Sequence, residues 1–427
     1  MLNQKIINKN FLQKINLIDI LQILILSLIP ALIIGPLIAE IILSISIIIF
    51  LICILKDNFY KKIIIFDKFF YFFCFFYGYF LLNSFFSFTP SIITFKIFFF
   101  FRFIFLLIII HFLISKDKNF LVNLSKIALF TFIIIFFDAL LQKMFTYNIL
   151  GQKYLNPFRI SSFFGDELVM GGYISRLCPI VLFGAFLFKN PNLKKLSAFT
   201  YILSIYFVLI SGERAALVSL IISLMYFLIF LNIPFTFKVS VAAIIIVFSS
   251  FFLTFDNKIK TRIINHYSEQ TTHSSSEKNL FFKFVPIQLI EINKSSSKMF
   301  AENKFFGLGP YSFRYYCDNK LQEKVCRGGH PHNSYLQLLA ETGLIGVFYF
   351  LIPFAFLIFT QFKAKLNIKN SLTIDKILNY NLFTISSCLV FMFLWPINQH
   401  GNIFNNWLNI SYYISFSIYI YFLRKKI

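Results

Sequence analysis

Apolar side chains occur along this chain in long unbroken runs rather than alternating with polar ones. About twenty apolar residues form a helix long enough to cross the hydrocarbon core of a bilayer, and runs of that length recur along nearly the whole sequence. A membrane-spanning barrel would show an alternation with a period of two, so the spans are predicted to be helices. We predict an all-α integral membrane protein with about twelve transmembrane helices, near residues 18–36, 37–55, 69–88, 95–115, 124–145, 168–188, 196–212, 215–231, 236–254, 335–359, 379–396 and 404–423.

The distribution of charge predicts the orientation of these spans. The net charge of +22 could indicate a nucleic-acid partner, but most Lys and Arg residues near the spans fall in alternate loops and at both ends of the chain. Lys and Arg concentrate in cytoplasmic loops of membrane proteins. We therefore expect both termini to be cytoplasmic, the basic residues to contact anionic membrane lipids, and nucleic acid not to be a partner.

One large polar insertion interrupts the bundle, at residues 255–334 between the ninth and tenth spans. With a cytoplasmic N-terminus, this loop lies outside the membrane, and a loop of this length in a compact bundle is usually functional or disordered. Residues 266–278 are polar enough to be mobile, whereas residues 295–306 are predicted to form a capped amphipathic helix. We interpret residues 1–427 as a single membrane domain that carries one inserted catalytic loop.

Two cysteines lie in this loop, eight residues apart. In an oxidising compartment Cys317 and Cys326 can form a disulfide that would brace the following segment. The rival interpretation is zinc ligation by these two thiols with His330 and His332, although the C-x8-C…H-x-H spacing matches no usual zinc site. We expect the disulfide and no metal site.

The sharpest local pattern begins at the end of the loop, in the string HPHNSYLQLLAETGLIG (330–346). Pro331 fixes the backbone, and Asn333 or Ser334 can cap the tenth span, which starts there. His332 is thus predicted to stand at a helix N-terminus, where exposed N–H groups favour an anion and disfavour a protonated imidazole. A neutral histidine beside a phosphate is what a general base requires. A histidine that merely caps the loop is the alternative.

This string resembles the O-antigen ligase and O-antigen polymerase superfamily, whose members carry an H-N-x-x-L-Q-x-x-x-E-x-G-x-x-G element at the start of a late helix. The matching positions are His332, Asn333, Leu336, Gln337, Glu341, Gly343 and Gly346. FGLGPYSFR (306–314), SGERAAL (211–217) and FFGDELVMGGYI (163–174) also resemble segments of that family. Twelve helices and one large periplasmic loop are the fold that the resemblance implies.

The resemblance implies a glycosyltransferase of the bacterial inner membrane, acting in lipopolysaccharide biosynthesis at the periplasmic face. Its donor would be a glycan on undecaprenyl diphosphate, and its acceptor lipid A–core or another glycan or protein. His332 would act as the base on the acceptor hydroxyl, while Arg214, beside Glu213 at the end of a span, would stabilise the departing diphosphate. Because the outside loops carry no acidic cluster for a divalent metal, we expect arginine to supply the positive charge, without metal or cofactor.

A second basic ligand of the diphosphate is expected, and several residues compete for the role. Arg314 ranks first because it lies within FGLGPYSFR; the other candidates for contacts with the diphosphate or glycan are Arg159, Lys283, Arg262, Arg327 and Asn333. His330 is interpreted as structural. Arg102 and Arg176 fall inside predicted spans and need a partner or a water-filled cavity, with Asp138 as a possible partner.

Three transfers use similar residues: ligation to lipid A–core, which we favour, polymerisation of repeat units, and O-glycosylation of a protein. A flippase or transporter of lipid-linked glycans is the alternative from another class. A transporter would show repeated halves and helices broken near the bilayer midplane, and neither pattern is evident.

Overall fold

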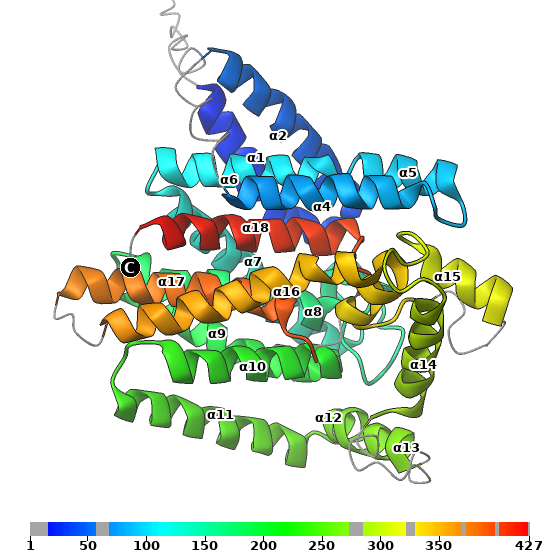
Figure 1. Cartoon of the computed structure of the whole chain (residues 1–427). Helices are drawn as coiled ribbons and strands as arrows, with labels where there is room; N and C mark the ends of the chain where they lie inside the picture. The colour runs from blue at the N-terminus through cyan, green and yellow to red at the C-terminus, as the bar shows by residue number, and fades with distance from the viewer. Residues whose placement is uncertain are drawn as a thin grey trace, which may run out of the picture.

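Long helices lying side by side dominate the structure (Figure 1). The computed structural model describes residues 16–56, 68–272, 285–321, 329–368, 373–397 and 401–425. The bundle helices are α1 (Leu17–Ile34), α2 (Pro36–Lys56), α4 (Lys68–Ser84), α5 (Pro90–Phe98), α6 (Phe101–Lys116), α7 (Phe120–Phe145), α8 (Met170–Leu187), α9 (Pro191–Ser211), α10 (Arg214–Phe230), α11 (Phe235–Phe255), α16 (Ser334–Ile368), α17 (Ile374–Leu394) and α18 (Asn406–Arg424).

Each predicted span overlaps at least one of these helices, and the all-α prediction is confirmed for the described residues. Nine helical segments among them are long and apolar enough to cross a membrane, and α5 and α6 together make one of the nine. Helices α4 and α10 each have 17 residues, and α18 is not among the nine. The count of twelve crossings therefore stays a prediction.

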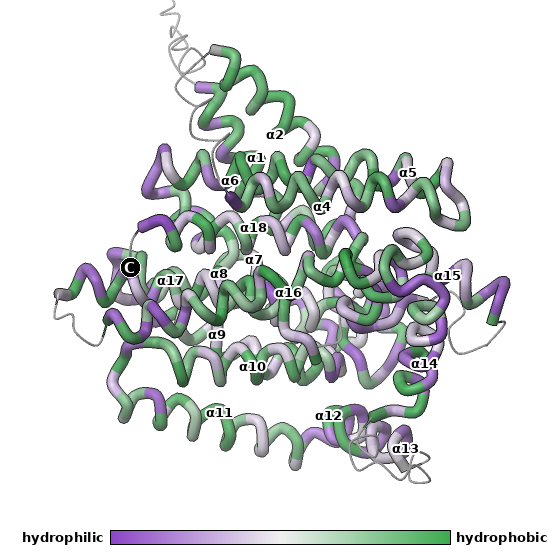
Figure 2. The backbone as a smooth tube through the Cα atoms, viewed as in Figure 1, coloured by the Kyte–Doolittle hydropathy of each residue, from purple (hydrophilic) through white to green (hydrophobic). Residues whose placement is uncertain are grey.

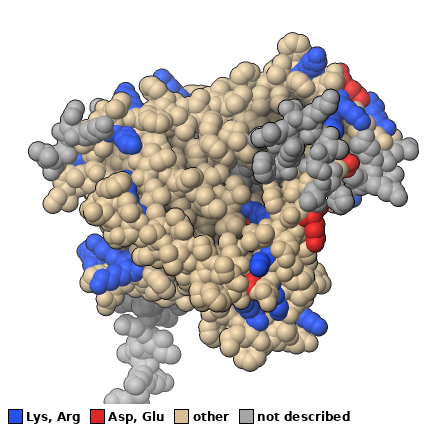
Figure 3. Space-filling model, turned by 90° about the horizontal axis from the view of Figure 1, so that it is seen from below, with Lys and Arg blue, Asp and Glu red and all other residues tan. Residues whose placement is uncertain are grey.

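The outer helices present apolar side chains to their surroundings. None of the residues of α11 is buried, and this helix lies along the outside of the bundle (Figure 2). By contrast, α8 and α17 are mostly buried and pack against each other at the centre. On the face shown in Figure 3, charged side chains lie mainly toward two ends and the surface between them is mostly uncharged. Apolar exteriors of this kind are stable in lipid, which solvates them as well as a protein core does.

Hydrogen bonds between helices hold the interior together. Tyr349 and Tyr413 share one at 3.0 Å, and the Ser417 hydroxyl on α18 donates to the carbonyl of Leu107 on α6 at 2.8 Å. Buried Ser, Thr and Tyr hydroxyls are common between helices in membranes because lipid offers no competing partner.

The predicted insertion folds against one end of the bundle, opposite the end that carries the C-terminus (Figure 1). Its described elements are α12 (Asn257–Lys260), the π-helix η3 (Thr261–Asn265), α13 (His266–Thr272), α14 (Ile287–Glu302), α15 (Ser312–Tyr316) and the π-helix η5 (Cys317–Leu321). One local prediction was wrong: the amphipathic helix expected at residues 295–306 starts earlier, at Ile287, and ends at Glu302. Residues 266–272 are helical, and the mobility expected of residues 266–278 stays a prediction. Helix α14 begins directly after Pro286, which occupies its N-cap and has no backbone N–H for a helical hydrogen bond.

Candidate active site

The H-N pair of the motif starts α16. The Asn333 carboxamide oxygen accepts hydrogen bonds from the backbone N–H groups of Tyr335 (2.9 Å) and Leu336 (3.1 Å), as a helix N-cap does. Its amide nitrogen donates to the carbonyl of Pro396 at 2.7 Å. Asn333 thus uses both polar ends within the protein, and the structure gives it a capping position rather than one on the cavity wall.

Gln337 and Glu341, further along the motif, tie α16 to two loops. The Gln337 amide nitrogen donates to Glu341 (3.0 Å) and to the side-chain oxygen of Asn402 (2.9 Å), while its oxygen accepts from the backbone N–H of Ile403. Glu341 in turn accepts from the backbone N–H of Phe313, at 3.1 Å. These motif residues hold the loops in place, and both are buried.

Gly343, the first glycine of the motif, allows a kink in α16. Gly343 has a φ of 67°, in the left-handed region that favours glycine, and its Cα lies against the backbone of Phe305. The peptide before the kink pairs with the GLGP segment, since the N–H of Gly309 donates to the carbonyl of Glu341 at 2.7 Å. The two segments that resemble the family are therefore packed backbone to backbone.

His332, directly before the cap, lines a cavity of about 1240 Å³. Its φ of 55° is unusual for a residue with a side chain, and strain of this kind is found most often at functional sites. Burial lowers the pKa of His332 below its ordinary value, which keeps the imidazole neutral near pH 7. The ring of His330 lies 4.3 Å from it, centroid to centroid, and lines the same cavity.

Five arginines from separate parts of the chain line this cavity with His332: Arg102, Arg159, Arg176, Arg214 and Arg262. Three of them were candidates from the sequence, and the structure brings those three together. Arg262 donates from Nε to the carbonyl of Gly212 (3.2 Å), and Arg159 donates from Nη2 to the carbonyl of Leu168 (2.9 Å). Backbone carbonyls thus orient two of the guanidinium groups.

Arg214 is the first residue of α10. Its Nη2 donates to the side-chain oxygen of Gln270 on α13 at 2.7 Å, and its guanidinium lies over the ring of Tyr267, 5.2 Å from the centroid. Its Nη1 is buried and has no hydrogen-bond partner among the described residues. A buried guanidinium donor without a partner is costly, so this atom fits an anionic ligand in the cavity.

Arg176, inside α8, is a cavity residue that sequence reasoning did not place in the site. Its Nη1 donates to the carbonyl of Gly172 at 3.1 Å, and its Nε is likewise buried without a partner in the described part of the chain. The rings of Phe393 and Trp407 flank the guanidinium, each at 6.0 Å. The available signal was its position within an apolar span, where an ionisable residue is functional by default.

Glu213, directly before Arg214 in the chain, lines the same cavity. It accepts from the backbone N–H groups of Gly171 (2.7 Å) and Gly172 (3.0 Å) at the start of α8. Burial raises the pKa of this carboxyl to about 7, even though these hydrogen bonds and the charges of Arg159 and Arg176 act in the opposite direction. With this pKa the carboxyl changes charge close to physiological pH, near the guanidinium groups of Arg159 and Arg176.

The remaining candidates lie elsewhere. Arg314 is 67% exposed, lies 3.9 Å from Asp318, and lines an adjoining pocket of about 650 Å³, not the main cavity. Lys283, Arg327 and Cys326 lie outside the described residues. Cys317 is buried and disulfide-bonded, and its pairing with Cys326 stays a prediction. Within the described ranges no group of three or more His, Cys, Asp or Glu side chains could hold a metal.

Asp138, the possible partner suggested for the intramembrane arginines, pairs with neither of them. Asp138 accepts from the hydroxyl of Ser162 (2.5 Å) and the backbone N–H of Ile149 (2.8 Å), so it fixes the loop after α7. Arg102 is paired with Glu40 of α2 at 2.6 Å instead.

Comparison with known proteins gives a family match over part of the chain. No curated protein matches the chain. A family model described as O-antigen ligase matches residues 199–351, which include Arg214, Arg262 and His332. The resemblance to the O-antigen ligase superfamily is thus confirmed over this region, and the match supports a membrane glycosyltransferase of the O-antigen ligase or polymerase type.

Proposed function

We propose that the protein transfers a glycan from an undecaprenyl-diphosphate carrier to an acceptor hydroxyl at the periplasmic face of the bacterial inner membrane, with lipid A–core as the favoured acceptor. One observation carries the proposal: a single cavity holds a neutral histidine together with five arginines, and Arg176 and Arg214 among them have buried N–H groups without a hydrogen-bond partner in the described part of the protein. A diphosphate is an anion that guanidinium forks bind well.

The reaction follows from this arrangement. The acceptor oxygen attacks the anomeric carbon of the donor sugar while His332 takes the hydroxyl proton. The bond between the anomeric carbon and the phosphate oxygen breaks, and its electron pair leaves with undecaprenyl diphosphate. The leaving group already carries negative charge, so the guanidinium groups stabilise it electrostatically and no proton donor is required.

Arg214 is the main ligand of the diphosphate in this scheme. Arg159, Arg176 and Arg262 add charge around it, and backbone carbonyls keep their orientation before the donor arrives. Preorganised charge of this kind needs no rearrangement during the reaction, which is why it is effective in a site with little water. Because the arginines supply the positive charge, transfer should continue in the presence of a chelator.

Deletion of the gene, followed by analysis of surface glycans, tests the acceptor. Free lipid A–core together with polymer left on the carrier would identify a ligase, and lipid A–core bearing single repeats would identify a polymerase. Normal surface glycans with glycan-free proteins would identify a protein O-glycosyltransferase. Unchanged glycans on every acceptor would contradict the proposal.

A further inference from the structure

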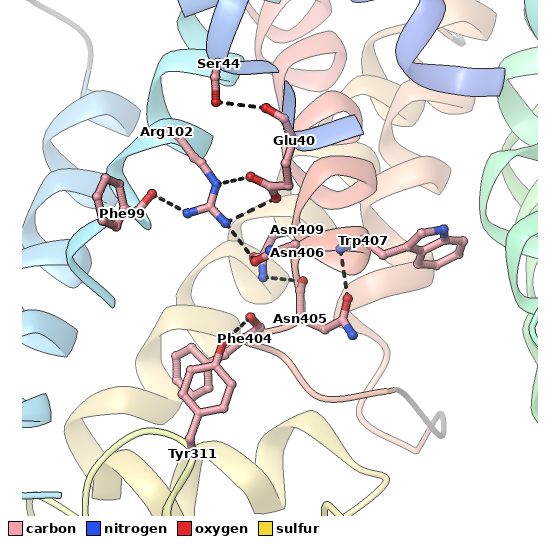
Figure 4. A network of polar contacts seen from close by, with 10 residues as sticks. All are labelled: Glu40, Ser44, Phe99, Arg102, Tyr311, Phe404, Asn405, Asn406, Trp407 and Asn409. Carbon is pink, nitrogen blue, oxygen red and sulfur yellow. Dashed lines mark hydrogen bonds and ion pairs between the residues drawn. The ribbon is translucent and has the colours of Figure 1, made fainter. Parts of the chain in front are cut away.

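A second cluster of polar side chains lines the same cavity, on walls formed by α2, α6 and the start of α18. Glu40 and Ser44 lie one helical turn apart on α2, and Arg102 reaches Glu40 from α6 (Figure 4). The side chains of Arg102 and Glu40 are only 12% and 20% exposed, and both belong to helices that are otherwise strongly apolar. A buried ion pair is a poor source of stability, so its presence here calls for a functional explanation.

Protein oxygens surround the guanidinium of Arg102, through an ion-pair contact at Nε and hydrogen bonds at Nη1 and Nη2. Its Nε lies 2.6 Å from one Glu40 oxygen, and its Nη2 donates to the other Glu40 oxygen (3.2 Å) and to the side chain of Asn406 (2.8 Å). Its Nη1 donates to the carbonyl of Phe99 at 2.5 Å. The pair is electrically neutral and offers no fork to a phosphate, in contrast to Arg214 and Arg176.

The groups that remain suit hydroxyls. Each carboxylate oxygen can accept two hydrogen bonds, so Glu40 keeps capacity beyond its contacts with Arg102. The side chains of Asn402, Asn405 and Asn406 line the same region of the cavity, and primary amides both donate and accept. Lys96 is the remaining charge here, with its ammonium over the ring of Tyr311, 5.3 Å from the centroid.

Aromatic rings complete these walls. The rings of Tyr311 and Phe404 lie 5.4 Å apart, and the Tyr311 hydroxyl donates to the carbonyl of Phe404 at 2.6 Å (Figure 4). Trp407 lies on the same stretch of chain and also lines the cavity. A sugar ring presents hydroxyl groups around its edge and apolar C–H groups on its faces, so it matches walls that combine amides and a carboxylate with aromatic surfaces.

The cavity has room for such a ligand beside a diphosphate. Its volume of about 1240 Å³ exceeds the roughly 300–1,000 Å³ typical of a site for one small molecule. Helix α2 also borders the lipid, since Ile41 and Ile45 are 50% and 43% exposed while Glu40 and Ser44 line the cavity. A sugar attached to a membrane lipid can therefore approach this wall from the bilayer.

We infer that the Glu40–Arg102 pair, with Asn406 and the rings of Tyr311 and Phe404, forms a subsite for an uncharged sugar ring, separate from the arginines that would hold the diphosphate. This inference rests on the proposed function and extends it to the sugar-binding part of the same cavity. The ring belongs either to the acceptor or to the glycan of the donor, and the test separates these sources.

The test uses purified full-length protein in lipid nanodiscs. Glu40→Gln/Arg102→Met removes both charges together and leaves no unpaired ion, and Asn406→Ala is a milder variant in case the first does not fold. Ser417→Ala is the matched control. It removes a hydrogen bond between α6 and α18, the helices that carry Arg102 and Asn406, at a position that does not line the cavity. Three quantities are measured: the KM for lipid A–core, and the Kd values for bare undecaprenyl diphosphate and for the same carrier bearing one repeat unit.

Loss of a charge-assisted hydrogen bond should raise the KM for lipid A–core by roughly tenfold or more if the acceptor sugar occupies the subsite. If the donor sugar occupies it, the Kd of the glycan-bearing carrier rises instead. In both cases the Kd of the bare carrier and all values for Ser417→Ala stay near wild type. Unchanged KM and Kd values, or equal weakening of the bare carrier, would overturn the inference. Absence of transfer by the wild type would refute the proposed function instead, and the difference between the two Kd values would still test the subsite.

Discussion

Replacing Arg214 by lysine keeps one positive charge in the cavity but removes the guanidinium fork. Arg214 uses Nη2 on Gln270 and leaves Nη1 buried without a partner in the described structure, facing a cavity whose proposed ligand is a diphosphate. A lysine ammonium is a single point of charge and cannot serve Gln270 and a phosphate oxygen with the same geometry. We therefore expect Arg214→Lys to weaken binding of the donor carrier.

The expected weakening corresponds to one charge-assisted hydrogen bond between Nη1 and a phosphate oxygen. One hydrogen bond between charged groups contributes about 1.5–3 kcal/mol, which corresponds to a rise in Kd of roughly 10- to 150-fold. The assay is binding of undecaprenyl diphosphate to purified protein in nanodiscs. Arg314→Lys is the matched control, because Arg314 is 67% exposed and lies outside the main cavity. Wild-type affinity in Arg214→Lys, or an equal loss in Arg314→Lys, would refute the assignment of the diphosphate to the arginine cavity.

Three further outcomes are expected. Because the pKa of Glu213 is about 7, its negative charge disappears as the pH falls, so the Kd of the glycan-bearing carrier should fall between about pH 8 and pH 6. Glu213→Gln should remove this pH dependence of the Kd, and a dependence that persists in the variant would contradict the assignment to Glu213. Gly343→Ala should lower the Tm of the purified protein, because the added Cβ would meet the backbone of Phe305 at a residue with positive φ, and strain of this kind costs about 1–3 kcal/mol. Gly78→Ala is the control and should not lower the Tm, because a Cβ at that position meets open space. Reporter fusions after Lys118 and after Lys320 should report cytoplasm and periplasm respectively; a cytoplasmic signal at Lys320 would place the catalytic loop on the wrong side.

The helices could be predicted well because each depends mainly on the composition of its own segment. A run of about twenty apolar residues has to form a helix in lipid, whatever surrounds it, since every backbone N–H and C=O must find a partner within the segment. The break between α5 and α6 and the early start of α14 were missed, because both depend on turns of a few residues rather than on the composition of a whole run.

The site could be predicted only in part, for a reason of geometry. His332 and Arg214 could be proposed because each stands in a recognisable string, and the structure places both on one cavity. Arg314 was ranked highly because it follows GLGP, but proximity in sequence does not determine the direction of a side chain, and α15 turns it outward. The partnership of Arg102 with Glu40 joins helices through residues 62 positions apart and could not be read from one sequence.

The most direct test of the proposed mechanism is transfer by a His332→Ala variant in a purified system with defined donor and acceptor. If His332 is the base, its removal should slow transfer by about 10²–10⁴-fold, while the protein stays folded and binds undecaprenyl diphosphate with wild-type affinity. His111→Ala, which alters a histidine beside Arg424 in the part of the bundle that carries the C-terminus, should transfer at a normal rate. Near-normal transfer by His332→Ala would contradict the mechanism and leave the histidine as a residue that only orients the start of α16.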